Sequence, residues 1–318
     1  MRKVLYVILG IVVVLLVAAW LKLRGPEIPF ADLEAKYAGT GSAFVDLAPD
    51  FRVHYQASGV PGSPVVVLLH GYGDAFTAWE HWAPVLAADY RVIALDLPGH
   101  GLTRAPEGYA LSGEGLADVL ERVTRALGLK SFALAGNSMG GGVAWNYALL
   151  HPERLTALVL VDAAGWPHAP TGDAPLAFRI LKYPIGRWFL AHIDNRPLIE
   201  SGLKGDVYDP GVITPAYVDR WAEFQRAPGH RATLMSIAPG GFGTATAQRL
   251  AALRVPTLVL HGEDDHMIPL ADGRAFAAAI PGATLITYPH VGHLPQVEVP
   301  ERSAHDVAAF LAQHPPAP

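Results

Sequence analysis

The residue in this sequence that is best placed for covalent chemistry is Ser138. It stands in Gly136-Asn137-Ser138-Met139-Gly140, which matches the pattern Gly-x-Ser-x-Gly. A strand-like apolar run precedes the motif at 132–135, and residues 139–150 are helix-like. A serine on so tight a turn projects its hydroxyl above the sheet edge, where the positive end of the next helix favours an oxyanion. We predict that Ser138 is a nucleophile; the alternative is a serine that only caps the helix.

His293 is the residue that we expect to act as the base for Ser138. The chain has 14 histidines, and His293 lies in a loop between the last strand-like run and the terminal helix. From such a loop a base can reach a serine at the carboxyl edge of the sheet. Its ordinary pKa suits proton abstraction near neutral pH. His290 is the main competitor, although it directly follows Pro289 at the strand end.

A carboxylate is expected to orient the base, and it should lie between the serine and the histidine in chain order. Asp264 and Asp265 both follow the apolar run 258–260. Their spacing does not separate them. Asp162, at the end of another strand-like run, is a further alternative, although its position is more typical of a helix or loop cap.

Two backbone N–H groups are predicted to form the oxyanion hole, those of Tyr72 and Met139. Tyr72 lies in His70-Gly71-Tyr72-Gly73-Asp74, a glycine-bearing loop that follows an apolar run. We interpret His70 as a structural histidine that bonds within this loop, rather than as a base.

These residues need a sheet whose strands end on one edge. Two alternating stretches, 44–47 and 51–55, predict an opening hairpin. Helix-like stretches separate most of the six short apolar runs that follow, which is typical of strands buried on both faces. We predict an α/β fold with a mostly parallel eight-stranded sheet and helices on both faces. The runs are 65–69, 92–95, 132–135, 155–161, 257–260 and 284–287.

The alternation breaks between 165 and 245, where aromatic residues and prolines are scattered among helix-like pieces. We predict an inserted helical lid there, and an α/β core made of residues 41–164 and 246–314. Residues 25–40 are expected to be a linker.

The N-terminal stretch from Val4 to Leu21 carries no charge and would be about 27 Å long as a helix. This length favours a membrane anchor over residues 1–24, with the catalytic domain periplasmic or otherwise extracytoplasmic. A cleaved signal peptide, and hence secretion, is the alternative. The net charge of −5 and the lack of basic runs exclude a typical nucleic-acid-binding surface.

Motifs along the chain resemble the α/β-hydrolase superfamily from about Gly41 to Ala312. They occur in the superfamily's order: His70-Gly71, Asp96 to Gly101, Gly136 to Gly140, Gly262 to Asp265 followed by Ile268-Pro269, and Gly292-His293. In that pattern the acid is the aspartate three residues after the glycine. The resemblance therefore implies Asp265 as the acid.

Two subfamilies share these motifs: monoacylglycerol-lipase-type esterases, and carbon–carbon bond hydrolases of aromatic degradation. The loop after His70 is similar to that of lipases, and Leu294 stands where the carbon–carbon hydrolases usually have Trp. The N-terminal segment also resembles that of membrane-bound monoacylglycerol lipases. These features favour the esterases.

We therefore expect a serine hydrolase that cleaves carboxylic esters, of apolar acyl groups or monoacylglycerols, through an acyl-enzyme. Its partner would be a small-molecule ester, and the reaction requires neither a cofactor nor a metal. The alternatives are a carbon–carbon bond hydrolase of vinylogous diketones, and a non-catalytic ligand-binding protein on the same scaffold.

Overall fold

An eight-stranded sheet forms the centre of the computed structural model, which describes residues 2–167, 176–237 and 241–315. The strand order is β1-β2-β4-β3-β5-β6-β7-β8. β2 is antiparallel to its neighbours β1 and β4, and the remaining pairs are parallel. The predicted fold class is confirmed. The strands are β1 (Ser42–Ala48), β2 (Phe51–Ser58), β3 (Val65–Leu69), β4 (Arg91–Leu95), β5 (Phe132–Asn137), β6 (Leu155–Val161), β7 (Thr257–Gly262) and β8 (Thr284–Tyr288).

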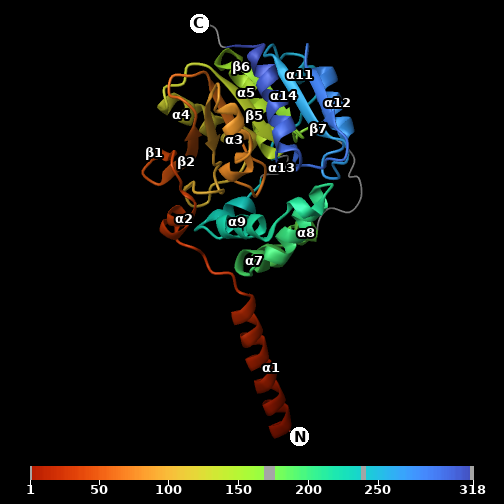
Figure 1. The fold of residues 1–318 in the computed structure, drawn as a ribbon. Helices are drawn as coiled ribbons and strands as arrows, with labels where there is room; N and C mark the ends of the chain where they lie inside the picture. Colours follow the sequence, from red (N-terminus) through yellow and green to blue (C-terminus); the bar gives the residue numbers. More distant parts are fainter. Residues whose placement is uncertain (1, 168–175, 238–240, 316–318) are drawn as a thin grey trace.

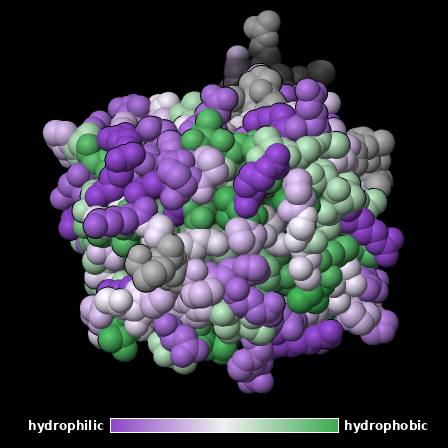
Figure 2. Space-filling view, turned by 90° about the horizontal axis from the view of Figure 1, so that it is seen from above, coloured by the Kyte–Doolittle hydropathy of each residue, from purple (hydrophilic) through white to green (hydrophobic). Residues whose placement is uncertain are grey.

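Helices cover both faces of this sheet (Figure 1). One apolar core joins the sheet to α4 (Gly113–Ala126), α5 (Met139–Leu150) and α12 (Leu270–Ala279). A second core joins the opposite face to α3 (Trp82–Leu86) and α14 (Pro300–Ala312). The end of the domain away from the N-terminus shows mixed hydrophilic and scattered apolar residues (Figure 2). The shorter elements of the core are η1 (Phe76–Trp79), η2 (Pro152–Arg154), α11 (Ala247–Leu250) and α13 (Pro295–Glu298).

A group of helices between β6 and β7 lies beside the sheet and occupies the region predicted as a lid (Figure 1). It shares a small apolar cluster with the start of α13, and this cluster includes Leu203, Tyr217 and Leu294. Residues 168–175 and 238–240 of the predicted lid lie outside the described residues, and the domain boundaries stay a prediction. The lid elements are α6 (Leu176–Leu181), α7 (Pro184–His192), α8 (Arg196–Asp206), η3 (Pro210–Val212), α9 (Pro215–Gln225) and α10 (His230–Leu234).

The N-terminal stretch forms helix α1 (Arg2–Leu23), which extends away from the body (Figure 1). Among the residues that the structure describes, however, none of the helices combines the length and the apolar character needed to cross a membrane. At about 27 Å, the uncharged run is slightly shorter than the ~30 Å hydrocarbon core of a bilayer. Its last turn is held by the lid, because Trp20 stacks on Trp188 of α7. The predicted membrane anchor is therefore wrong, and the predicted extracytoplasmic or secreted location is withdrawn with it.

The stretch expected to be a linker contains a helix, α2 (Phe30–Tyr37), and its Leu33 is buried in the second apolar core. Lys36 of α2 pairs with Glu223 of the lid helix α9 at 2.7 Å. Just before α2, the backbone N–H of Gly25 donates to the His192 carbonyl at the end of α7. The segment between α1 and β1 thus connects the lid to the core.

Candidate active site

Ser138 lies on the turn between β5 and α5 with a φ of 52°, in the left-handed region that residues other than glycine rarely adopt. Neighbouring glycines make this turn possible. A Cβ on Gly136 would lie 2.3 Å from Gly140, and a Cβ on Gly140 would lie 2.2 Å from the Leu69 carbonyl oxygen. The serine carbonyl accepts hydrogen bonds from the N–H groups of Gly142 and Ala164. The turn is therefore rigid and brings Ser138 to the carboxyl edge of the sheet.

The loop after β3 passes directly over this serine. A Cβ built on Gly71 would be 3.4 Å from the Ser138 Cβ, and Tyr72 lines the same cavity as Ser138. Met139 is the first residue of α5, so its N–H belongs to the first turn, whose donors have no partner within the helix. Both predicted oxyanion donors therefore belong to segments beside the serine, and their role stays a prediction.

His70 in this loop is buried and bonded at both ring nitrogens. Its Nδ1 lies 2.7 Å from the Gly71 carbonyl oxygen, and its Nε2 accepts from the Leu97 N–H at 3.0 Å. Burial lowers its pKa, which favours the neutral ring that this pattern needs. The contacts agree with the interpretation of His70 as a structural residue.

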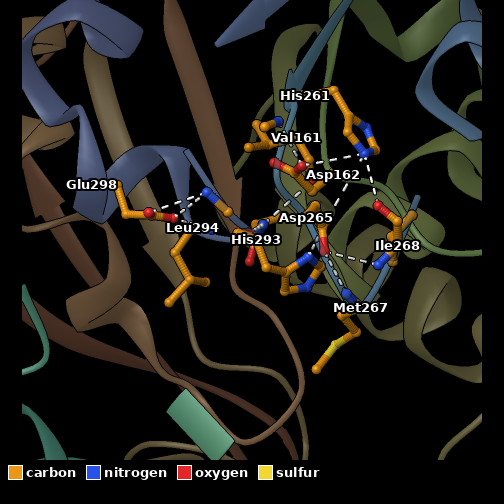
Figure 3. A network of polar contacts seen from close by, with 12 residues as sticks. Val161, Asp162, His261, Asp265, Met267, Ile268, His293, Leu294 and Glu298 are labelled. Atoms are coloured by element: carbon orange, nitrogen blue, oxygen red, sulfur yellow. Dashed lines mark hydrogen bonds and ion pairs between the residues drawn. The ribbon is translucent and has the colours of Figure 1, made fainter. Parts of the chain in front are cut away.

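His293 and Asp265 are in direct contact: the histidine Nδ1 lies 2.6 Å from Oδ2 of the aspartate (Figure 3). The other carboxylate oxygen accepts the N–H groups of Met267 and Ile268. Burial disfavours both charged forms, but their mutual attraction outweighs it, so the pKa of Asp265 is lowered and the pKa of His293 is raised. The histidine Nε2 is buried and lacks a hydrogen-bond partner among the described residues. It makes no hydrogen bond to Ser138 in this structure, so it is free to accept a proton from the serine hydroxyl when the two come together.

The two competitors point elsewhere. Asp264 accepts from the His290 backbone N–H at 3.0 Å, and the His290 side chain is exposed and packs against Tyr208. The contact that spacing alone left open is thus made by Asp265.

Asp162 and His261 lie next to Asp265 (Figure 3). Asp162 accepts from the Gly262 N–H at 3.0 Å, and His261 donates through Nε2 to the Ile268 carbonyl at the same distance. Burial and the nearby charge of Asp265 raise the pKa of Asp162 well above its usual range. Asp162, His261 and Asp265 each have a side-chain atom that could bind a metal ion, and these atoms lie within 4.8 Å of one another. They take part in this hydrogen-bond network, which holds the ends of β6 and β7 together.

Two acidic residues at the site were not predicted. Glu298 accepts the N–H groups of Gly292, Leu294 and Tyr208, so it fixes the loop that carries His293 (Figure 3). Asp206, at the end of α8, accepts the His293 N–H through its carbonyl at 2.7 Å and lines the cavity. Burial raises the pKa of its carboxyl to about 6. Both depend on contacts across the chain that no local pattern signals.

A cavity of about 500 Å³ lies between the core and the lid, and both Ser138 and His293 line it. Most of its wall on the lid side is apolar. This part includes Leu181, Leu190, Leu198, Ile199, Leu234 and Met235. Such a chamber has room for an apolar molecule with a carbonyl group beside the serine.

Comparison with known proteins finds relatives that match most of the chain. The chain is 32% identical over 272 residues to a 2-hydroxymuconate semialdehyde hydrolase of Pseudomonas sp. (strain CF600), covering 84% of this chain and 93% of the relative. It is 30% identical over 275 residues to a 2-hydroxy-6-oxo-6-phenylhexa-2,4-dienoate hydrolase of Burkholderia cepacia, covering 83% and 92%. A solved structure of a membrane phospholipase A, described as a bacterial virulence factor, aligns over 100% of both chains with a TM-score of 0.74 and 25% identity.

These two relatives are named as hydrolases of a semialdehyde and of a dienoate, and not as esterases of the monoacylglycerol-lipase type, which the sequence features had favoured. A family model described as alpha/beta hydrolase fold matches residues 64–199 and 200–300. These segments contain Ser138, Asp265 and His293. The chain is a hydrolase and belongs to the alpha/beta hydrolase fold family.

Proposed function

We propose that the chain is a serine hydrolase that breaks a carbon–carbon bond next to a carbonyl group in an apolar keto acid. Ser138 is the nucleophile, His293 the base, Asp265 the residue that orients the base, and the N–H groups of Tyr72 and Met139 the oxyanion donors. The observation that carries this proposal is the His293–Asp265 contact on the wall of the cavity that also holds Ser138.

The substrate of one relative indicates which type of bond is broken. A 2-hydroxy-6-oxo-dienoate contains no ester, so its hydrolysis must break a carbon–carbon bond. In the keto form of such a compound, the electron pair of the broken bond can be delocalised through a double bond onto a second carbonyl oxygen. This makes the carbon a possible leaving group.

The proposed reaction has three steps. The Ser138 Oγ forms a bond to the ketone carbon while His293 takes the hydroxyl proton. The carbon–carbon bond then breaks, and the proton on His293 passes to the leaving carbon. Water, deprotonated by His293, releases the acyl group from the serine as a carboxylic acid. The reaction consumes one water and needs no oxidant or reductant.

Ester hydrolysis is the second candidate, since it uses the same first step. The leucine-rich cavity wall would accept an acyl chain. Leu294, beside the base, packs into the apolar core of the lid. The full-length alignment with a phospholipase A supports the same reading.

A comparison of two substrate classes separates the two candidate functions. We would compare kcat/KM for 2-hydroxy-6-oxo-6-phenylhexa-2,4-dienoate, followed by loss of its conjugated absorbance, with kcat/KM for p-nitrophenyl esters of increasing chain length. Carbon–carbon cleavage predicts at least about a tenfold preference for the dienoate, equivalent to ~1.4 kcal/mol of transition-state stabilisation. Efficient ester turnover without dienoate turnover would select the second candidate. Ser138→Ala is the control for background hydrolysis.

A further inference from the structure

We propose that Asp162 carries a proton and donates it in a hydrogen bond to Asp265, so that a neutral carboxylic acid supports the charged one. Asp162 is thereby a positioning residue, which acts on His293 through Asp265. The inference deepens the proposed function and rests on it, because it concerns the same catalytic acid and base. It applies equally to carbon–carbon cleavage and to ester hydrolysis, since both use His293.

Asp162 directly follows β6 and lies beside the turn that carries the nucleophile. Its φ of 43° is in the left-handed region, which a residue other than glycine keeps only where its surroundings impose it. The preceding Val161 accepts from the Ser138 N–H, and the Ala164 N–H donates to the Ser138 carbonyl. The Asp162 side chain is completely buried. The same short segment therefore fixes both the serine and the buried acid.

Hydrogen-bond donors decide which of the two carboxyl groups is charged. Asp265 accepts three hydrogen bonds, two from backbone N–H groups and one from the His293 Nδ1. Asp162 accepts one, from the Gly262 N–H, and its Oδ2 meets no donor in the described part of the chain. Hydrogen bonds to a charged carboxylate stabilise the charge. The negative charge therefore belongs on Asp265 and the proton on Asp162.

The surroundings give Asp162 no cation to balance a charge. Within the described ranges, the ion-pair contact within 4.0 Å of its carboxyl comes from His261 alone, whose Nε2 lies 3.5 Å away (Figure 3). That nitrogen donates to the Ile268 carbonyl at 3.0 Å, and burial lowers the pKa of the His261 ring, which favours the neutral form. A charged Asp162 would thus be buried without compensation. The remaining titratable groups around the pair are Tyr288 on β8, Glu298 on α13 and Asp206 on α8.

The two carboxyl groups are close enough to share the proton. One oxygen of each lies within 4.8 Å of the other in the same buried cluster. Two carboxylates in one buried site avoid ionising together, and one of them keeps its proton. In agreement, burial, the charge of Asp265 and a hydrogen bond between the two groups raise the pKa of Asp162 well above its ordinary range. The shared hydrogen bond takes up part of the Asp265 charge, which limits how far Asp265 raises the pKa of His293 against the effect of burial.

Infrared difference spectroscopy tests the proton directly. Spectra of the wild type and of Asp162→Asn are compared at neutral pH, in water and in deuterium oxide. Asparagine has the size of a protonated aspartate, tolerates a positive φ, and can donate to Asp265 while it accepts from Gly262. We expect the variant to lose one carbonyl band of a protonated carboxyl group. Loss of a carboxylate band instead would show that Asp162 is charged and would overturn the inference.

The pH profile of kcat/KM on the better substrate tests the effect on His293. Asp162→Asn keeps the donor to Asp265, so its acid limb should stay within about 0.3 pH units of the wild type. Asp162→Gly accepts the same φ but removes the donor, so the undiluted charge of Asp265 should move the limb upward by about 0.5–1 pH unit. An unchanged limb in Asp162→Gly, or a downward shift in Asp162→Asn, contradicts the inference.

Asp206→Asn is the matched control, because it makes the same chemical change at another acid that faces His293. The charge of Asp206 contributes to the raised pKa of His293, so its loss should move the acid limb to lower pH. Asp162→Asn removes a proton donor of the same kind but no charge, and should not produce this shift. Equal downward shifts in both variants would assign a charge to Asp162 and end the inference.

Failure of this inference can be told apart from failure of the proposed function. The infrared measurement needs no substrate, so it decides the protonation of Asp162 even for a chain that cleaves neither dienoates nor esters. If the wild type cleaves esters alone, carbon–carbon cleavage fails, and the pH profiles are compared on an ester. If the dienoate is cleaved but Asp162→Asn loses a carboxylate band, only the role of Asp162 is lost.

Discussion

The two walls of the catalytic cavity are held in different ways. On the core side, Ser138, Gly71 and His293 lie on turns at strand ends, where backbone hydrogen bonds and close glycine contacts leave little freedom. On the lid side, α7, α8 and α10 supply an apolar wall supported by a small cluster and by bonds to the segment around Gly25. In the proposed function, the core wall fixes the reacting groups and the lid wall provides the surface that selects the ligand. This division predicts that core substitutions reduce turnover and lid substitutions change binding or pH dependence.

The largest effect is expected from Ser138→Ala. Loss of the nucleophile should lower kcat about 10⁴- to 10⁶-fold on the best substrate, since no covalent intermediate can form. The midpoint of thermal unfolding should stay close to that of the wild type, which serves as the control for folding. Turnover within about tenfold of wild type would show that the core wall does not carry the chemistry.

The next effect separates two neighbouring acids. Asp265→Asn should lower kcat by about 10³- to 10⁴-fold, because the amide can no longer hold His293 in the required tautomer. Asp264→Asn should change kcat by less than about threefold, since Asp264 bonds to the His290 backbone instead. Steady-state kinetics of the two variants is the measurement, and a reversed ranking would move the acid by one residue.

A pair of glycines compares the rigidity of the two walls. Gly140→Ala should lower the free energy of unfolding by at least ~2 kcal/mol, because the new Cβ would meet the Leu69 carbonyl. Gly202 lies within α8 with nothing within 4 Å of a built Cβ, so Gly202→Ala should raise the free energy by about 0.5–1 kcal/mol. Urea unfolding measures both. Equal effects would contradict a difference in rigidity.

The smallest effect concerns the pH profile. His293 must be neutral to accept a proton, so kcat/KM should fall as pH drops through its pKa, which Asp265 and Asp206 raise. Asp206→Asn removes one of these charges. The acid limb should therefore move to lower pH, with little change in kcat above the limb. A limb that moves upward, or a large loss of kcat at high pH, would show another role for Asp206.

The sequence predicted the core wall well because its signals are local. Six apolar runs coincide with strands, and Ser138 is marked by its strand, turn and helix. Asp264 and Asp265 could not be separated by spacing, because one backbone bond decides which carboxylate faces His293. Glu298 and Asp206 make their contacts between distant segments, which no periodicity reveals. The same limit explains the N-terminal error: an apolar run predicts a helix but not the stacking of Trp20 on the lid.

Labelling with a fluorophosphonate, followed by mass spectrometry, tests the central claim most directly. A phosphonate reacts only with a serine whose hydroxyl is activated, and the adduct reports its position. We predict one adduct on Ser138 in the wild type, none in Ser138→Ala, and strongly slowed labelling in His293→Ala. Labelling at another residue, or a wild-type chain that stays unlabelled, would contradict the assignment of Ser138 as an activated nucleophile.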